Sequence, residues 1–523
     1  MIRSSLSNWL GLFVTGVINL ILTPILIHRL GDFRYGIWIL VFSVVSYYGL
    51  LDLGMYTTAL RFVAQARGEG DRQRLNQVLA NSLAITSILA VVAMLVTGLL
   101  VWLVPHFFGL SGASRHLFRS VLLLLGMSVA ITSLSQMLGN YLCGLDRFEL
   151  FNLARIVCSI LRAFMMLLAL KWGQGLTGLA WATLIASLIS LLLHWYLIRR
   201  ADPLLTIQRS YASWSRVREL MGFGFFSFLT TVGNYGRFYL DSLVIARVLT
   251  VALITPFSIA GQIVEYFRVI VQGVMSPMIT SFSSMVGKKC NPEDLQEGLL
   301  KTTRFTSLLS LFVGSLLLLN GQTFIRLWVG DRFLQSYGPL AILTIAYTIM
   351  LAQVPSNAVL YALNRHRVMA AWTLGEGLAN VALSVYLARN HGLVGVALGT
   401  AIPMVFVTAL VQPWYVLRQL RLSAWAYLSR AVARATAVAV VFFVLSQLGG
   451  SVGSTSGLLA LMCRVVWQSI LFLLLAFFMG LTGEDRRLCL DYCGRFTILR
   501  RQEVNQTARE GSGRLGFDGG KQL

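Results

Sequence analysis

Long apolar runs separated by short polar segments recur along most of the chain. An apolar run of about 18 residues or more can cross roughly 30 Å of hydrocarbon as a helix. The pattern predicts about fourteen membrane-spanning helices, at residues 8–28, 36–58, 78–104, 118–142, 150–170, 175–198, 220–245, 252–282, 303–320, 338–362, 368–388, 392–416, 431–448 and 458–482. The chain is therefore predicted to be an all-α polytopic membrane protein.

The composition excludes a soluble globular protein. Hydrophobic residues make up 56% of the 523 positions and charged residues only 12%, whereas soluble domains have about 25% charged residues. The 43 basic residues exceed the 21 acidic residues and give a net charge of +22. In a soluble chain this excess would suggest a nucleic-acid partner, but here the basic residues lie between apolar runs. Their positions indicate how the chain is oriented in the membrane, and no nucleic-acid partner is predicted.

The distribution of Lys and Arg predicts the orientation in the membrane, because basic residues in short loops stay on the cytoplasmic side. If the N-terminus is inside, about 29 basic residues lie at or near cytoplasmic segments and about nine lie on the opposite face. Both termini are therefore predicted to be cytoplasmic, in a multi-pass protein of the cell inner membrane.

The spacing of the spans predicts two six-helix halves with an additional pair of helices. The inner loop at 199–219 is long for this chain and carries five arginines, so we interpret it as the connection between the halves. The predicted units are an N-terminal lobe at 1–198, the linker at 199–219, a C-terminal lobe at 220–417, helices thirteen and fourteen within 418–482, and a partly disordered cytoplasmic tail at 483–523.

Several charged and polar side chains are predicted within the membrane, where a charge costs roughly 2.5–3.5 kcal/mol on insertion scales and marks function by default. They are Asn234, Tyr235, Arg237 and Asp241 on the seventh span, Glu265 and Arg268 on the eighth, and Asp52, Arg162 and Glu376 on the second, fifth and eleventh. Residues three or four apart share a helix face, so the seventh and eighth spans favour a polar central cavity. The alternative is that these groups form structural ion pairs, Asp241 with Arg237 among them, or extend to the headgroups.

Motifs for other chemistries are absent from the sequence. No phosphate-binding loop, zinc-protease motif or Ser-His-Asp arrangement occurs in a plausible context. Cys489 and Cys493 have no further metal ligands nearby, so no metal site is predicted. We expect no cofactor and no enzymatic activity.

Two stretches carry a family resemblance. Residues 22–65, LTPILIHRLGDFRYGIWILVFSVVSYYGLLDLGMYTTALRFVAQ, resemble the opening of O-antigen-type polysaccharide flippases of the multidrug/oligosaccharidyl-lipid/polysaccharide exporter superfamily. Residues 222–249, GFGFFSFLTTVGNYGRFYLDSLVIARVL, look like the seventh helix of the same family, and LGTAIPMVF at 398–406 looks like its twelfth. The looser resemblance spans about residues 1–420.

The resemblance implies two six-helix lobes around a central cavity that opens alternately to each side. In that family a cationic cavity takes the diphosphate and sugars of an undecaprenyl-linked oligosaccharide and moves them from the cytoplasmic to the periplasmic leaflet for surface polysaccharide biosynthesis. The cavity helices one, two, seven and eight here carry Asn19, Asp52, Arg61, Asn234, Arg237, Asp241, Glu265 and Arg268. The first span has no arginine in its membrane interior, unlike lipid II flippases, and this disfavours a peptidoglycan precursor as substrate.

The candidate substrate-binding residues are therefore Arg237, Arg268, Arg61, Arg162, Asn234 and Tyr235. The ion-coupling candidates, for H⁺ or Na⁺, are Glu265 first, then Asp241 and Asp52. The expected partners are the lipid-linked oligosaccharide diphosphate, membrane lipids, and a polysaccharide polymerase with its chain-length machinery. Two alternatives stay open: an ion-coupled drug or organic-cation antiporter of the same superfamily, and a membrane enzyme of polysaccharide assembly. The first would prefer an acidic cavity, and the second would need a larger loop or domain outside the membrane.

Overall fold

The computed structural model describes residues 2–52, 55–109, 112–203, 205, 240–275, 277–288, 291–363, 365–448 and 457–487. Within these ranges all regular elements are helices. The elements of the N-terminal part are α1 (Ile2–Leu30), α2 (Asp32–Ser46), the 3₁₀ turn η1 (Tyr47–Asp52), α3 (Met55–Glu69), α4 (Arg72–Phe107), α5 (Gly112–Gly144), α6 (Phe148–Lys171) and α7 (Gly175–Ala201).

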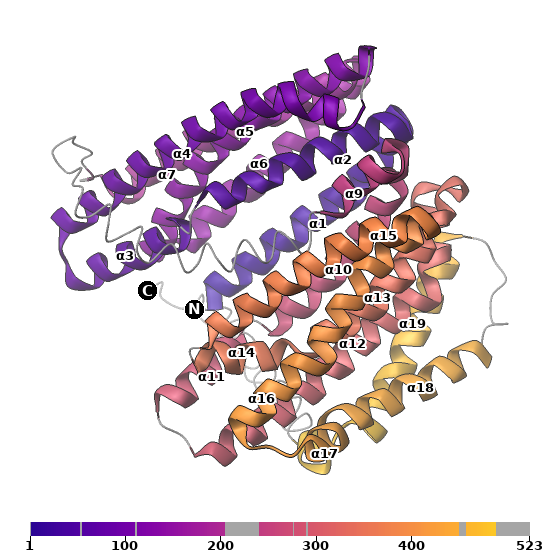
Figure 1. Cartoon of the computed structure of the whole chain (residues 1–523). Helices are drawn as coiled ribbons and strands as arrows, with labels where there is room; N and C mark the ends of the chain where they lie inside the picture. Colours follow the sequence, from indigo (N-terminus) through magenta and orange to yellow (C-terminus); the bar gives the residue numbers. More distant parts are fainter. Residues whose placement is uncertain are drawn as a thin grey trace, which may run out of the picture.

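The second part begins with α9 (Asp241–Val248), η3 (Val251–Leu253), α10 (Ile254–Met275), α11 (Pro277–Gly287), α12 (Pro292–Val329), η4 (Asp331–Ser336), α13 (Tyr337–Ala352) and α14 (Val354–Ala362). It continues with α15 (His366–Phe406), η5 (Val407–Val411), α16 (Gln412–Leu420), α17 (Ala424–Tyr427), η6 (Leu428–Val432), α18 (Ala433–Leu448), α19 (Leu458–Leu475) and η7 (Ala476–Gly480). Figure 1 shows the two parts as two groups of helices side by side, with α1 and α2 of the first group next to α9 and α10 of the second. We call them the N-terminal and C-terminal bundles.

Local sequence explains where several helices begin and end. Asp71 precedes α4, and its carboxylate accepts a hydrogen bond from the backbone N–H of Arg74 at 2.9 Å, which satisfies one of the open donors of the first turn. Pro292 occupies the first turn of α12, where its missing N–H costs nothing. Gly392 adopts a φ of +56°, which a residue with a side chain rarely takes, and it breaks α15 into two helices.

The helices confirm the predicted fold class. Twelve helical segments in the described ranges are long and apolar enough to cross a membrane. One of them, Arg367–Leu420, contains two predicted spans that meet near Gly392, so thirteen predicted spans have a counterpart. The remaining one, 220–245, lies mostly outside the described residues. The number fourteen is thus approximate, and the predicted domain boundaries stay predictions.

Several predicted ranges were wrong in detail. The span predicted at 36–58 is two helices, α2 and α3, separated by η1 and the stretch after it. The span predicted at 303–320 is the much longer α12, and residues 59–77, between the second and third predicted spans, are largely helical. An apolar window detects only the part of a helix that lies in hydrocarbon, so polar helix ends that extend beyond the membrane are missed.

The predicted orientation defines an inner end of the molecule, toward the cytoplasm, and an outer end. Reporter fusions should read as external after Gly175 or within 449–457, and as cytoplasmic within 199–219. This alternation follows from the excess of basic residues on inner segments. The opposite reporter pattern would contradict the topology.

Candidate functional site

The polar stripe is a row of side chains along the face of α10 that looks toward the N-terminal bundle. It consists of Gln262, Glu265, Tyr266, Arg268 and Gln272. At its outer end, the hydroxyl of Thr23 on α1 donates to Oε1 of Gln262 at 3.1 Å, and Nε2 of Gln262 donates to the hydroxyl of Tyr266 at 3.1 Å. The opposite side of α10 is apolar and buried, at Ile259, Ile263, Phe267 and Val271. The stripe contacts the N-terminal bundle at Gln262, and Glu265, Arg268 and Gln272 continue it along α10 toward the inner end.

Arg268 is held in the middle of this stripe by an acid and an amide. Its Nε donates to Glu265 Oε2 at 2.7 Å, Nη2 donates to Glu265 Oε1, and Nη1 donates to Gln272 Oε1 at 2.9 Å. The Arg268 side chain is 26% exposed and that of Glu265 is 46% exposed. Both charges sit inside a membrane-spanning helix and still have open space beside them. A guanidinium fork in this position can bind an anion if Glu265 releases it.

The other predicted substrate-binding residues do not all join this stripe. Arg237, Asn234 and Tyr235 lie outside the described residues. Arg61 is exposed on α3 in the N-terminal bundle. Arg162 is partly buried on α6, two turns beyond Arg155, which packs against Gly11 of α1. Arg162 therefore lies on the α6 face that meets α1.

The ion-coupling candidates lie at three separate positions. Asp52 belongs to η1, where its Oδ2 accepts from the backbone N–H of Tyr56 at 3.5 Å. It borders a small pocket of about 80 Å³ inside the N-terminal bundle, next to Thr86 and Ser133. Glu265 belongs to the polar stripe. Asp241 begins α9 in the C-terminal bundle, and only 9% of it is exposed.

Asp241 belongs to a buried cluster of oxygen atoms around the Thr400 hydroxyl. The Thr400 hydroxyl of α15 lies 2.9 Å from Asp241 Oδ1, 3.3 Å from Asn380 Oδ1 and 3.3 Å from the Val396 carbonyl. The Ser384 hydroxyl lies 2.8 Å from the same Asn380 oxygen and 3.3 Å from the same carbonyl. Each hydroxyl has one proton to donate, so two protons serve three acceptor atoms, and the second carboxylate oxygen adds a fourth. This set of atoms is suited to hold a small cation.

The outer ends of the two bundles are joined by polar contacts that the sequence did not predict. Arg332 of η4 pairs with the Asp32 carboxylate of α2 at 2.7 Å, and the Thr255 hydroxyl donates to the Asp32 carbonyl at 2.6 Å. Nearer the middle of the membrane, the Trp328 indole N–H donates to the Leu20 carbonyl at 2.7 Å. These contacts and the Thr23–Gln262 bond all lie in the outer half. The described part of the molecule is therefore closed at its outer end.

Gly36 makes this closure possible, because α2 packs directly on η3 there. A Cβ atom at Gly36 would clash with the backbone carbonyl oxygen of Val251, whereas a Cβ at Gly16 of α1 would meet nothing within 4 Å. We expect Gly36→Ala to weaken the outer contact by about 1–3 kcal/mol through overpacking, and Gly16→Ala to leave it unchanged. The measurement is labelling of a cysteine placed at Val251, which is buried in this contact, by a membrane-impermeant reagent. Equal labelling in both glycine variants would contradict the prediction.

No described group of three or more His, Cys, Asp or Glu residues could hold a metal ion, and the described cysteines, Cys143, Cys158 and Cys463, are free thiols. Cys489 and Cys493 lie outside the described residues.

Comparison with protein families identifies the chain. Residues 34–338, more than half of its length, match the family model described as "Polysaccharide biosynthesis protein". The chain belongs to this family. Two relatives are an "Uncharacterized membrane protein EpsK" of Bacillus subtilis (strain 168), 23% identical with 92% of this chain and 96% of the relative covered, and a "Putative O-antigen transporter" of Shigella flexneri, 20% identical with 79% and 97% covered.

A solved structure shares the fold of this family member. It is described as "Lipid II flippase MurJ, inward closed conformation" and has a TM-score of 0.70, with 91% of this chain and 98% of that chain covered at 12% identity. An identity this low supports the fold alone. The comparison therefore confirms the all-helical membrane fold predicted from the sequence.

Proposed function

We propose that the protein is a flippase that moves an undecaprenyl-diphosphate-linked oligosaccharide from the cytoplasmic to the periplasmic leaflet by alternating access, for surface polysaccharide biosynthesis. The observation that carries this proposal is the partly exposed Arg268 guanidinium within α10, the helix that contacts α1 through Gln262. An arginine stays charged when partly desolvated, and its planar fork matches phosphate oxygens. The family description and the name of the O-antigen relative support the same class of substrate.

The polar stripe suggests how the diphosphate is bound and released. Arg268 gives its donors to Glu265 and Gln272, so a diphosphate must compete with Glu265 for the guanidinium. Two phosphate groups carry more negative charge than one carboxylate and can displace it. With the outer end closed by Asp32 and Arg332, the substrate enters from the inner side. Opening toward the periplasm requires these outer contacts to separate.

Energy for uphill transport is proposed to come from an ion bound near Asp241. The sequence ranked Glu265 first, but Glu265 is partly exposed and paired with Arg268, so its simplest role is to occupy the arginine when no substrate is present. Asp241 is buried and bonded to the Thr400 hydroxyl, which also contacts Asn380 Oδ1 and the Val396 carbonyl, and these oxygen atoms are offered to H⁺ or Na⁺. Because α9 and α15 both contribute, binding of a cation would draw these two helices together.

This function would act before a polysaccharide polymerase and its chain-length machinery, which would then be its partners in the inner membrane. An ion-coupled antiporter of organic cations is the competing function. It would use Glu265 of the polar stripe and Asp241 of the buried cluster, and Arg268 would have no role in binding the substrate. Enzymatic activity is not proposed.

Transport in sealed vesicles tests the proposal. The purified protein is reconstituted with a fluorescent undecaprenyl-diphosphate-linked oligosaccharide, and the fraction exposed on each face is measured with an impermeant sugar-oxidising reagent. We expect redistribution across the membrane with wild-type protein and none in protein-free vesicles. Uptake of organic cations without movement of the lipid would establish the antiporter instead, and contradict the proposal.

A further inference from the structure

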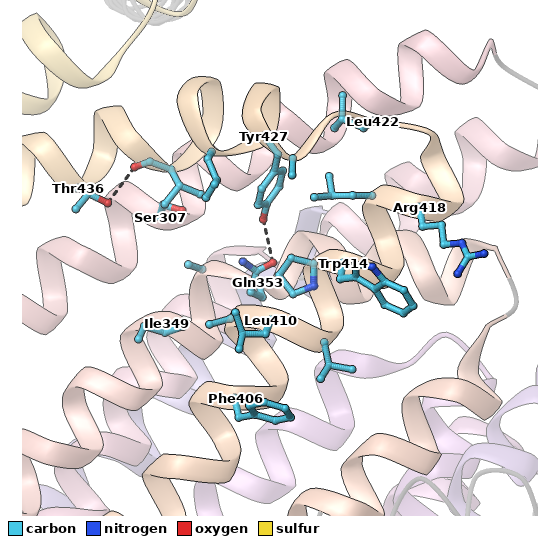
Figure 2. Close-up of a pocket in the computed structure, with 18 of the residues that line it drawn as sticks. Ser307, Ile349, Gln353, Phe406, Leu410, Trp414, Arg418, Leu422, Tyr427 and Thr436 are labelled. Atoms are coloured by element: carbon cyan, nitrogen blue, oxygen red, sulfur yellow. Dashed lines mark hydrogen bonds between the residues drawn. The ribbon is translucent and has the colours of Figure 1, made fainter.

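A large cavity lies within the C-terminal bundle, on the side away from the N-terminal bundle. Its volume is about 1090 Å³, above the roughly 300–1,000 Å³ of ordinary small-molecule pockets. Helices α12 and α13 form one wall, η5 and α16 form the second, and α17, η6 and α18 form the third (Figures 1 and 2). Both η5 and η6 are π-helical turns, which are rare and often occur at functional sites.

The cavity has an apolar body and is open to the bilayer. Phe406, Leu410, Trp414 and Leu428 line it and are exposed. Figure 2 shows the Phe406, Leu410 and Trp414 side chains on one wall and Tyr427 projecting from the opposite one. In a membrane, the acyl chains of lipids cover an exposed apolar surface of this kind.

The inner end of the cavity is basic. Arg418, near the end of α16, and Arg421, just after it, line this end and are exposed. The Arg418 guanidinium lies over the Trp414 ring, 5.6 Å from its center. The predicted topology places the turn between α16 and α17 at the cytoplasmic leaflet, where anionic headgroups are found.

Polar groups are also built into the wall. The Tyr427 hydroxyl donates to Gln353 Oε1 at 2.9 Å (Figure 2). Behind the wall, the Ser356 hydroxyl donates to the same oxygen at 2.9 Å. Ser307 lines the cavity with 2% of its surface exposed, and its hydroxyl has no hydrogen-bond partner among the described residues. A buried hydroxyl of this kind can donate to an ester oxygen of a bound lipid.

We propose that this cavity holds one resident anionic phospholipid of the cytoplasmic leaflet, with its acyl chains against Phe406 and Leu410 and its phosphate at Arg418 and Arg421. Basic pockets between membrane helices on the cytoplasmic side bind such headgroups. The cavity is lined by elements of the C-terminal bundle. Neither α10, which carries the polar stripe, nor α1, which contacts it, contributes a lining residue. A lipid bound here is therefore separated from the proposed transport route. It fills the space between α18 and the rest of the bundle.

Native mass spectrometry of the purified protein tests this site independently of transport. The wild type is titrated with phosphatidylglycerol and with phosphatidylethanolamine of the same acyl chains, and undecaprenyl diphosphate is added as a competitor. We expect one tightly bound phosphatidylglycerol, and a loss of affinity of about 10- to 30-fold in Arg418→Gln/Arg421→Gln, since each arginine contributes to anion attraction.

The matched control is Arg430→Gln/Arg434→Gln. It removes the same charge from exposed arginines of η6 and α18 that do not line the cavity, and it should bind phosphatidylglycerol like the wild type. Ala409→Trp fills the apolar body and should weaken binding of both phospholipids without a change in charge. Equal affinity for phosphatidylglycerol in the wild type and Arg418→Gln/Arg421→Gln would overturn the proposal. So would displacement of phosphatidylglycerol by equimolar undecaprenyl diphosphate, which would make the cavity a substrate site.

Discussion

Arg268→Gln is expected to lower the transport rate about 10- to 100-fold, because hydrogen bonds to a charged group contribute about 1.5–3 kcal/mol. Glutamine keeps a polar side chain on α10 but loses the charge and the fork of donors. Arg268→Lys should rescue transport only in part, since an ammonium cannot bind two oxygens in the same planar geometry. The measurement is the initial rate of lipid redistribution in vesicles, normalised to folded protein.

The control separates substrate binding from the ion pair within α10. Arg268→Gln also leaves Glu265 without the partner that holds both of its oxygens. Glu265→Gln removes the competing carboxylate and keeps Arg268, so it should retain diphosphate binding or strengthen it. Normal transport by Arg268→Gln would contradict the cationic site. Failure of Arg268→Gln to accumulate, with recovery of folded protein and of transport in Glu265→Gln/Arg268→Gln, would show that the pair is structural.

Asp241→Asn is expected to abolish the response of transport to an imposed ion gradient while leaving diphosphate binding intact. The substitution preserves the size of the side chain but removes the one acid among the described atoms that contact Thr400. Loss of a charged ligand should weaken cation affinity by at least about 10-fold. Transport is measured with and without an imposed proton or sodium gradient, for the wild type, Asp241→Asn and Glu265→Gln.

The three proteins give distinct outcomes. If Asp241 binds the coupling ion, the gradient accelerates the wild type and Glu265→Gln but has no effect on Asp241→Asn. Gradient-dependent transport that persists in Asp241→Asn and disappears in Glu265→Gln would restore Glu265 as the coupling residue. If the wild-type transport rate is the same with and without each gradient, ion coupling is excluded.

The sequence predicts well those helices that lie almost entirely within the hydrocarbon core of the membrane. An apolar window suffices to find α6 or α19, because nearly the whole helix lies in the membrane. The break at η1 was missed, since residues 47–51 continue the apolar run of α2 without a proline. The polar inner end of α12 was missed for the opposite reason: helix propensity, which the window does not measure, extends it to Pro292.

In the candidate site, the sequence predicts contacts only between residues that are close together along the chain. Glu265 and Arg268 are three residues apart, so their pairing follows from helical spacing, and the structure confirms it. Asp241 and Thr400 are 159 residues apart, and Asp32 and Arg332 are 300 apart. A single sequence carries no signal for such contacts. The alternative that Asp241 pairs with Arg237 stays untested, because Arg237 lies outside the described residues, and the contact of Asp241 that the structure shows is the hydrogen bond from Thr400.

The central claim is that Arg268 exchanges Glu265 for the diphosphate of a lipid-linked oligosaccharide. The most direct test is a structure of the full-length protein in lipid nanodiscs with undecaprenyl-diphosphate-linked oligosaccharide, determined by electron cryomicroscopy. We predict phosphate oxygens within hydrogen-bonding distance of the Arg268 guanidinium, between the two bundles, with Glu265 turned away. A diphosphate bound elsewhere while the Arg268–Glu265 pair stays intact would contradict the claim.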